Sequence, residues 1–420
     1  MPKKNTVFQD MPYELQLKVF SFLTPKELCH CVAPVCKEWL KCAYDPALWK
    51  SLNLKNFVRG EKDVNSVCTI LIRSTMLRSL TLRASSFPLD KIAFYSSCFP
   101  LLRKLDLGFC DGVGNEVLCT FITSCPLIED LNVEGCVGVD CQAVCKIIWL
   151  KHLKKLNLSH CTFLNNEAVM KIASHCSELE SLNIDGITRI TDSAVCLLGD
   201  NLHSSLQHLE VDGEDLTDAS YLSLSKCIYL KTFAVSYAEE MTDQSLEYIK
   251  QKMKELRWLK LRRGSKLTTS ALNNLFKSCC LKHLAHLDLD SLSLDDRCVA
   301  SITSCCRNLR SFSLAWCWEI SDVGLEDIIL HCSKLEVLDL TGLYKLTGVC
   351  LLKVPNLVPR LRYLNLEQCN DIIDAILTEL VKVMPYLKVI NYYGEVVEPS
   401  SLSSSESEHE DSVQPSPVSP

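Results

Sequence analysis

Residues 153–184 read LKKLNLSHCTFLNNEAVMKIASHCSELESLNI, and this stretch contains the unit from which most of the chain is built. The same apolar frame, Leu-x-x-Leu-x-Leu or a close variant, stands at both of its ends, with central leucines at Leu156 and Leu182. Apolar residues that recur at every second position indicate a short strand. Residues 166–175, between the two frames, carry a helical pattern instead. The stretch therefore predicts a strand, a helix and a second strand.

The frame recurs along the whole chain with a spacing of 24 to 28 residues. Its 13 central positions are Leu80, Leu105, Leu131, Leu156, Leu182, Leu209, Phe233, Leu259, Leu287, Phe312, Leu338, Leu364 and Ile390. A half-copy, Trp49-x-x-Leu52-x-Leu54, precedes them. A period of 20–29 residues with this frame is the signature of leucine-rich repeats.

One strand and one helix cannot cover their own apolar faces, so such repeats must stack on one another. We therefore expect an α/β fold: a curved leucine-rich-repeat solenoid over residues 55–393, with a parallel sheet on the concave face and helices outside. The frame leucines should point into the core. The residues between them should line the concave face, because successive side chains of a strand point to opposite sides.

Residues 10–49, DMPYELQLKVFSFLTPKELCHCVAPVCKEWLKCAYDPALW, predict three short helices before the repeats. Leu15, Val19, Phe20 and Leu23 make an apolar stripe in the first helix. Thr24 and Glu27 have the spacing of a capping box, with Pro25 at the first helical position of the second helix. Pro34 precedes a third helix over residues 35–44. So small a unit cannot bury a core alone and needs a partner on at least one face.

The order of blocks in this unit resembles the F-box motif. The blocks are Met11-Pro12-x-Glu14-Leu15, Val19-Phe20-Ser21-Phe22-Leu23, Val35-Cys36-Lys37-x-Trp39 and Asp45-Pro46-x-Leu48-Trp49. Together with the repeats they place the chain closest to the F-box and leucine-rich-repeat family. The resemblance implies a three-helix F-box over residues 8–54. It also implies that the F-box binds the adaptor of a cullin–RING ubiquitin ligase core, through residues that we expect to be Pro12, Leu15, Val19, Phe20 and Leu23.

The family resemblance implies a non-enzymatic role as the substrate-recognition subunit of an SCF-type (cullin–RING) E3 ubiquitin ligase. The repeats would then bind a protein substrate. The alternative is a repeat scaffold or inhibitor-like binding protein with a non-degradative role, in which the helical unit only caps the solenoid. In either case, the chain lacks a Gly-rich phosphate loop, a Gly-x-Ser-x-Gly elbow and a His-Glu-x-x-His motif.

The concave face offers candidate substrate contacts, which we expect at Trp258, Lys260, Arg262, Arg263 and Trp316. The two arginines and the lysine predict a basic patch beside exposed aromatic residues, a combination common at binding hot spots. An acidic or phosphorylated segment would complement such a patch. Earlier repeats place acidic residues such as Glu134, Asp185 and Glu210 on the same face. An ordinary solvated sheet face is the alternative.

The 25 cysteines follow the repeat. One set lies three residues before the frame and comprises Cys125, Cys176, Cys227, Cys306 and Cys332; a second set lies three residues after it and comprises Cys110, Cys136, Cys161, Cys317 and Cys369. A buried cysteine behaves as a small apolar residue, so this phasing predicts structural thiols. No Cys-x-x-Cys pair occurs, so we expect neither a metal site nor a cofactor, and we expect the thiols to be reduced.

Residues 394–420 differ in composition from the repeats and predict a disordered, acidic, Ser/Pro-rich tail. Candidate phosphorylation sites within it are Ser405, Ser407, Ser416 and Ser419. The tail holds six of the acidic residues, so the rest of a chain with net charge −7 is close to neutral. We therefore expect no nucleic-acid partner. Because no apolar run approaches about 18 residues, we also expect no membrane contact, and a cytoplasmic or nuclear location.

Overall fold

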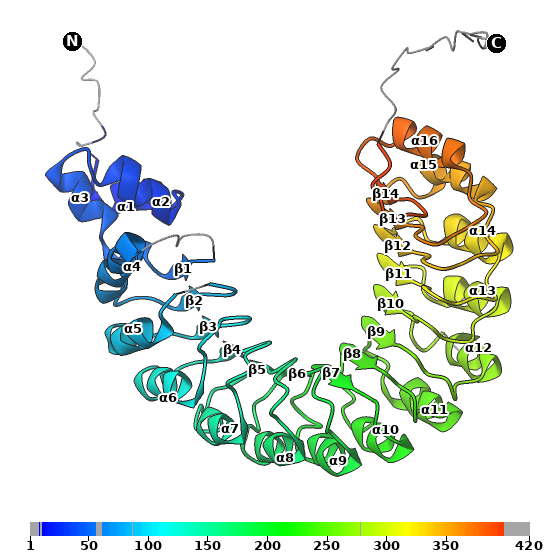
Figure 1. The fold of residues 1–420 in the computed structure, drawn as a ribbon, viewed down its shortest axis with the longest axis horizontal. Helices are drawn as coiled ribbons and strands as arrows, with labels where there is room; N and C mark the ends of the chain where they lie inside the picture. Colours follow the sequence, from blue (N-terminus) through cyan, green and yellow to red (C-terminus); the bar gives the residue numbers. More distant parts are fainter. Residues whose placement is uncertain (1–7, 9–10, 56–60, 86, 278, 399–420) are drawn as a thin grey trace, which may run out of the picture.

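The computed structural model describes residue 8 and residues 11–55, 61–85, 87–277 and 279–398. These residues form one open arch, with strands along its inner side and helices along its outer side (Figure 1). The helical unit lies at the end of one arm and the last repeats at the end of the other (Figure 1). No helix in this part of the chain is long and apolar enough to cross a membrane.

The N-terminal unit contains the three predicted helical segments, although two of them differ in detail. Its elements are α1 (Tyr13–Phe20), α2 (Pro25–Glu27), a π-helical turn η2 (Leu28–Val32), α3 (Lys37–Ala43) and a 3-10 turn η3 (Pro46–Leu48). The capping box forms as predicted, since the Thr24 side chain accepts from the Glu27 N–H and the Glu27 carboxylate accepts from the Thr24 N–H. The third helix begins after Val35, because Cys36 is extended and acts as its N-cap.

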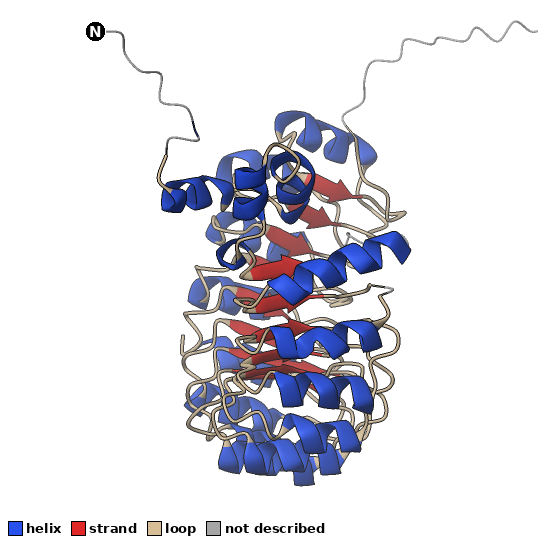
Figure 2. Ribbon diagram, turned by 90° about the vertical axis from the view of Figure 1, so that its left-hand side faces the viewer, coloured by secondary structure: helices blue, strands red, loops and turns tan. Residues whose placement is uncertain are grey.

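In the described residues a sheet of 14 parallel strands follows, and its spatial order is the order of the sequence. The strands are β1 (Ser51–Asn53), β2 (Ser79–Thr81), β3 (Lys104–Asp106), β4 (Asp130–Asn132), β5 (Lys155–Asn157), β6 (Ser181–Ile184), β7 (His208–Asp212), β8 (Thr232–Ser236), β9 (Trp258–Leu261), β10 (His286–Asp288), β11 (Ser311–Ser313), β12 (Val337–Asp339), β13 (Tyr363–Asn365) and β14 (Lys388–Ile390). Seen from the side, the strands stack in a row between the connecting loops (Figure 2).

One helical segment follows almost every strand and packs against the segment of the next repeat. These segments are α4 (Glu61–Arg73), α5 (Leu89–Phe94) with η4 (Tyr95–Cys98), α6 (Asn115–Ser124), α7 (Cys141–Ile147), α8 (Asn166–His175), α9 (Asp192–Asn201), α10 (Asp218–Leu224), α11 (Asp243–Lys252), α12 (Thr269–Lys277), α13 (Asp296–Cys305), α14 (Asp322–His331), η5 (Val349–Lys353) with α15 (Val354–Leu357), and α16 (Asp374–Val383). The predicted helix over residues 166–175 is therefore confirmed.

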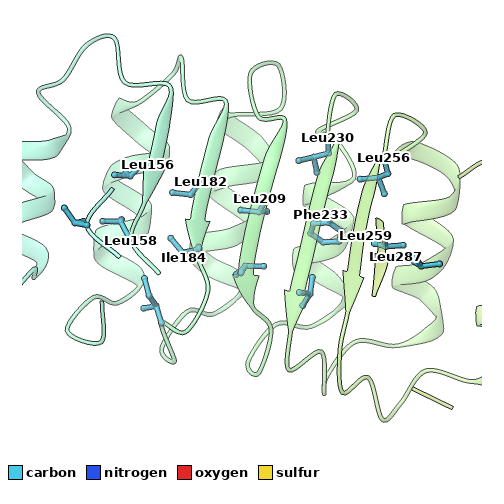
Figure 3. Packing of buried hydrophobic residues seen from close by; sticks show 14 of the residues in the cluster. Leu156, Leu158, Leu182, Ile184, Leu209, Leu230, Phe233, Leu256, Leu259 and Leu287 are labelled. Carbon is cyan, nitrogen blue, oxygen red and sulfur yellow. The ribbon is translucent and has the colours of Figure 1, made fainter. Parts of the chain in front are cut away.

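The frame residues form the core between the sheet and the helices, as predicted. Central residues of neighbouring strands pair directly, for example Leu156 with Leu182 and Leu209 with Phe233. Figure 3 shows these side chains as a continuous apolar layer behind the strands. None of these four residues is more than 2% exposed. Each repeat thus shares its core with its neighbours, which is the condition for a stable solenoid.

The last repeat corrects our assignment by one residue. Leu364 pairs with Val389 rather than with Ile390, so Val389 is the central residue of β14. The frame leucine that precedes this strand, Leu387, lies one residue nearer to it than in other repeats, and this shift made Ile390 look like the better match. Ile390 forms a backbone bridge to Val396 in the segment that follows.

The predicted tail begins later than residue 394. The Val397 N–H donates to the Val389 carbonyl at 2.9 Å, and the Asn391 N–H donates to the Glu395 carbonyl at 2.9 Å. Residues 395–398 therefore run back along β14, and Val397 packs against the core. The remaining tail, 399–420, lies outside the described residues, as do its four candidate phosphorylation sites, Ser405, Ser407, Ser416 and Ser419.

Candidate functional site

Exposed apolar side chains gather on α1 of the helical unit. Leu15 is 50% exposed, Val19 is 42% exposed and Phe22, just after the helix, is 78% exposed. Their spacing of four and three residues places them along one side of the helix. Large apolar side chains left in water on so small a unit mark a surface that a partner can cover.

Phe20, one of the expected adaptor contacts, does not belong to this exposed surface. It is 3% exposed and packs inside the unit, where its ring centroid lies 5.3 Å from that of Phe8 and 5.2 Å from that of Trp39. Of the other expected contacts, Pro12 is exposed at the N-cap of α1, whereas Leu23 is half-buried against the core. The side of α1 that packs inside the unit and the side that faces solvent thus carry different residues.

Phe22 is a member of the exposed surface that the predicted stripe did not include. It follows Phe20 by two residues, so in a helix the two rings point to different sides. The chain leaves the helix at Ser21, and the ring of Phe22 stays outside with the Lys18 ammonium 5.6 Å from its centroid. The available signal was the spacing of Phe20 and Phe22, because two rings only two residues apart cannot belong to one buried helical stripe.

The expected basic patch on the concave face is already neutralised by neighbouring carboxylates. The Arg262 guanidinium donates to both oxygens of Asp288, at 3.1 and 2.9 Å through Nε and at 2.5 Å through Nη2. The Lys260 Nζ lies 3.9 Å from the Asp185 carboxylate, three strands away. Strands β7 and β8 lie between the two residues, and Ala234, the neighbour of Lys260 on β8, is small enough for the lysine to extend across it.

The centre of the concave face is therefore acidic rather than basic. Burial raises the pKa of Glu210, and it outweighs the opposing attraction of Lys260. Burial also raises the pKa of Asp212, with further repulsion from Asp185. Lys260 extends from β9 toward this acidic group and lies beside the Asp185 carboxylate, which follows β6. The prediction that this patch attracts an acidic or phosphorylated segment loses its basis.

A row of left-handed residues forms the rim of the concave face. It occupies the fourth position after the central residue of most repeats. Its members with a side chain are Ala84, Phe109, His160, Tyr237, Arg263, Ser291, Trp316 and Gln368, and its glycines with positive φ are Gly135, Gly186 and Gly342. Sequence periodicity gave no sign of this backbone conformation, which only glycine adopts without strain.

Large rim residues lie across the next glycine of the row. Any Cβ on Gly135, Gly186 or Gly342 would overlap the side chain of the previous rim residue, which is Phe109, His160 or Trp316, respectively. The predicted contact Trp316 is thus half-buried and packed between repeats. Arg263 lies over the Tyr237 ring, with 4.6 Å from its guanidinium carbon to the ring centroid.

Two adjoining hollows meet at this rim. The first has a volume of about 860 Å³ and is lined by Arg263, Leu292, Asp295, Trp316 and Trp318, among others. The second has about 570 Å³, and its walls include Arg263, Tyr237 and the acidic centre. Trp258, the remaining predicted contact, is 43% exposed on β9 beside the His286 ring. Trp258 and Arg263 are therefore accessible, Trp316 is partly so, and Lys260 and Arg262 are engaged.

The phased cysteines are buried as predicted. Those that follow the frame form a regular ladder, because each donates its S–H to a backbone carbonyl of the preceding repeat. Examples are Cys136 to the Leu107 carbonyl at 3.2 Å and Cys317 to the Leu289 carbonyl at 3.2 Å. Burial raises the pKa of Cys136 to about 12. These thiols join consecutive repeats, which explains their fixed phase.

Family models match both parts of this architecture. An F-box-like model matches residues 8–55, and a leucine-rich-repeat model matches residues 150–173 and 305–328. The chain therefore combines an F-box-like unit with leucine-rich repeats. The F-box-like match covers the unit that carries the exposed stripe of α1, and the two repeat matches lie within the solenoid.

Known proteins of similar sequence include F-box/LRR-repeat protein 4 of Bos taurus, which is 25% identical over 79% of this chain and 46% of its own length. DNA repair protein RAD7 of Saccharomyces cerevisiae is 22% identical over 82% of this chain and 59% of its own. Lysine-specific demethylase 2A of Xenopus tropicalis is 24% identical, but the match covers only 22% of that protein. Each match thus covers less than two thirds of the relative's own length.

The fold resembles a solved structure, the complex of Rad7 and Elc1 from yeast. The TM-score is 0.66 at 18% identity, and the match covers 88% of this chain and 98% of that one. At this level of identity the likeness concerns the fold alone.

Proposed function

We propose that this protein is the substrate-recognition subunit of a cullin–RING E3 ubiquitin ligase. The observation that carries this proposal is the apolar surface formed by Leu15, Val19 and Phe22 on an F-box-like unit. Complete burial of one large apolar side chain contributes about 1.5–3 kcal/mol, so covering these three partly exposed side chains would favour a protein contact. The partner of this surface is the small adaptor that links F-box proteins to the cullin–RING core.

The substrate is a protein that binds the rim of the concave face in the C-terminal half of the solenoid. Arg263, Trp316 and Trp318 surround the larger hollow there, and Trp258 lies nearby on β9. Tryptophan and arginine at the edge of a concave surface supply contact area and directed hydrogen bonds. Lys260 and Arg262 are paired with carboxylates, so in this proposal they position the acidic side chains of the face and do not bind the substrate as free cations.

The chain itself is non-catalytic in this proposal, and its role is to hold a substrate at a fixed place relative to the ligase. A repeat scaffold without ligase function remains the second candidate, favoured only by the general capacity of solenoids to bind many partners. The two candidates differ in one respect, namely whether the α1 surface binds the adaptor. A ligase subunit of this kind acts in the cytoplasm or nucleus.

The test is co-purification of the adaptor and cullin with a Leu15→Ala/Phe22→Ala double variant. Removal of two large contacts should weaken the complex at least about tenfold. Phe163→Ala is the control, because Phe163 is also a largely exposed phenylalanine, lies on the solenoid, and should leave the complex unchanged when it is removed. Undiminished recovery of the adaptor with the double variant would favour the scaffold.

A further inference from the structure

A hollow of about 770 Å³ lies between the loops that lead into β7, β8 and β9. It is at the edge where these strands begin, whereas the rim of left-handed residues follows the edge where they end. Ile228 and Tyr229 form an apolar part of its wall and are 48% and 53% exposed. Three lysines line the same hollow, Lys231, Lys252 and Lys254. This surface is therefore separate from the proposed substrate site and from α1.

The charge of this surface depends on one row of residues that crosses the sheet. The row is the position two residues before the central residue of each strand. From residue 103 to residue 362, each member donates its N–H to the carbonyl of the preceding member, so consecutive members are neighbours in space. Cations and carboxylates alternate over most of the row. Three of its neighbouring pairs are ion pairs: Arg103 with Glu129, Lys154 with Glu180 at 3.6 Å, and Arg310 with Glu336 at 3.1 Å.

The alternation stops at the hollow. The Lys231 Nζ donates to the Gln207 Oε1 at 2.7 Å, and because this amide is neutral, the charge of Lys231 stays uncompensated. The next two members of the row are Arg257 and Ala285, so Arg257 has no carboxylate on either side. Glu180, which precedes Gln207 in the row, is already paired with the lysine before it. Two adjacent cations are therefore left without a partner carboxylate.

Two further lysines add to this positive charge. Lys252 ends α11 and Lys254 lies in the loop that follows, and both are exposed. Neither forms an ion pair with another described residue. Among the described residues that line the hollow, Glu255 is the only carboxylate. The surface is thus locally positive in a chain whose net charge is −7, which favours a negatively charged partner at this place.

We propose that this hollow binds an acidic segment of a partner protein, in which carboxylates lie beside one large apolar side chain. The lysines and Arg257 contact the carboxylates, and Ile228 and Tyr229 cover the apolar side chain. The positive surface spans three strands, or about 10 Å at the usual strand spacing. This short span and the apolar wall suit a peptide segment better than a nucleic-acid backbone. The inference does not rest on the proposed ligase role, because it uses neither the α1 surface nor the rim.

The experiment is fluorescence anisotropy with the full chain and a labelled peptide in which glutamates flank one leucine. We expect binding that weakens as salt is added, because salt screens exposed charges. Lys254→Glu should weaken binding at least about fivefold, since it replaces attraction by repulsion. Lys151→Glu is the matched control. Lys151 is also exposed and also lies five residues before the central residue of its strand, but there the row is neutralised by ion pairs. This variant should bind the peptide as the natural chain does.

A second peptide tests the apolar wall. With serine in place of leucine, the peptide should bind the natural chain about fivefold more weakly, because less apolar surface is covered. Tyr229→Ala should reduce this preference for leucine, since it removes part of the wall. Absence of binding by the glutamate–leucine peptide at low salt would overturn the proposal, as would equal losses in Lys254→Glu and Lys151→Glu. Equally tight binding of single-stranded DNA of the same charge would also overturn it, because the surface would then recognise charge alone.

Discussion

The indole of Trp316 lies across the backbone of Gly342, so closely that any Cβ at residue 342 would overlap the ring. Gly342 also has a φ of 74°, which an L-residue with a side chain rarely adopts. Each condition alone would favour glycine, and here the two coincide. The contact fixes one of the two tryptophans that line the larger hollow.

We expect Gly342→Ala to destabilise the solenoid by about 1–3 kcal/mol and to displace Trp316. Tryptophan fluorescence and the free energy of unfolding in urea measure the two effects. Gly112→Ala is the control for positive φ alone, because nothing lies within 4 Å of a Cβ at that glycine. Equal losses in both variants would show that the ring contact contributes nothing.

Phe20→Ala should unfold the N-terminal unit, because the ring is buried against Phe8 and Trp39. A loss of about 3–5 kcal/mol is expected for such a truncation. Phe22→Ala should cost less than about 0.5 kcal/mol, since its ring is mainly in water. Hydrogen exchange of the α1 amides distinguishes the two variants. Similar protection in both would contradict the assignment of Phe20 to the buried side and of Phe22 to the exposed side.

The Asp218 carboxylate links two repeats and should make stability depend on pH. Burial opposes its ionisation, but hydrogen bonds from Ser245 and Thr242 outweigh burial and lower the pKa of Asp218. A lowered pKa in the folded state means that the stabilisation is present above the ordinary carboxyl pKa of about 3.9. It is lost as pH falls through the folded value.

We therefore expect Asp218→Ala to cost about 1–3 kcal/mol near pH 7 and clearly less near pH 3. Urea unfolding at both pH values tests this. Asp215→Ala, at an exposed carboxylate of the same repeat, should change little at either pH. A cost for Asp218→Ala that did not shrink in acid would mean that the hydrogen bonds do not depend on the charge.

Arg262→Glu should lower stability by about 1–3 kcal/mol, because it removes an ion pair and places a carboxylate beside Asp288 and Asp290. Arg263→Glu is the matched charge reversal on the next residue. Arg263 stacks on Tyr237 and forms no ion pair among the described residues, so its cost should be smaller. Calorimetric melting of both variants measures the difference. A larger loss of stability in Arg263→Glu than in Arg262→Glu would contradict the view that neighbouring carboxylates neutralise Arg262.

A chain that ends at Glu398 should melt within about one or two degrees of the full chain. A chain that ends at Gly394 should melt about 2–4 °C lower, because it loses the return segment and its hydrogen bonds to β14. Circular dichroism on heating gives both midpoints. Identical midpoints for the two truncations would show that residues 395–398 add no stability.

The repeat made most of the fold predictable, since the period alone located the strands and the helix of residues 166–175. The miss at Ile390 arose because one residue is lacking between Leu387 and the strand, which periodicity cannot detect. The helical unit showed the same limit. Phe20 and Phe22 are equally apolar in sequence, and only the packing of Phe8 and Trp39 decides which ring is buried.

The candidate substrate site was less predictable because its charges are set by neighbours far apart in the sequence. Arg262 and Asp288 are 26 residues apart, and Lys260 reaches Asp185 across three strands. A list of cations along one strand cannot show that adjacent strands already neutralise them. The aromatic residues at Trp258 and Trp316 were located correctly on the face or rim, because their positions follow from the repeat.

The unbroken pairing from β1 to β14 has a geometric consequence for anything held by the arch. Trp49 anchors the helical unit to the first strand through a bond from its Nε1 to the Ala43 carbonyl, so the sheet begins where that unit ends. The distance between the helical unit and the last strand is therefore set by the number of repeats between them. In the proposed ligase subunit, insertion or removal of one repeat would change the distance between the adaptor and the substrate without altering either binding surface.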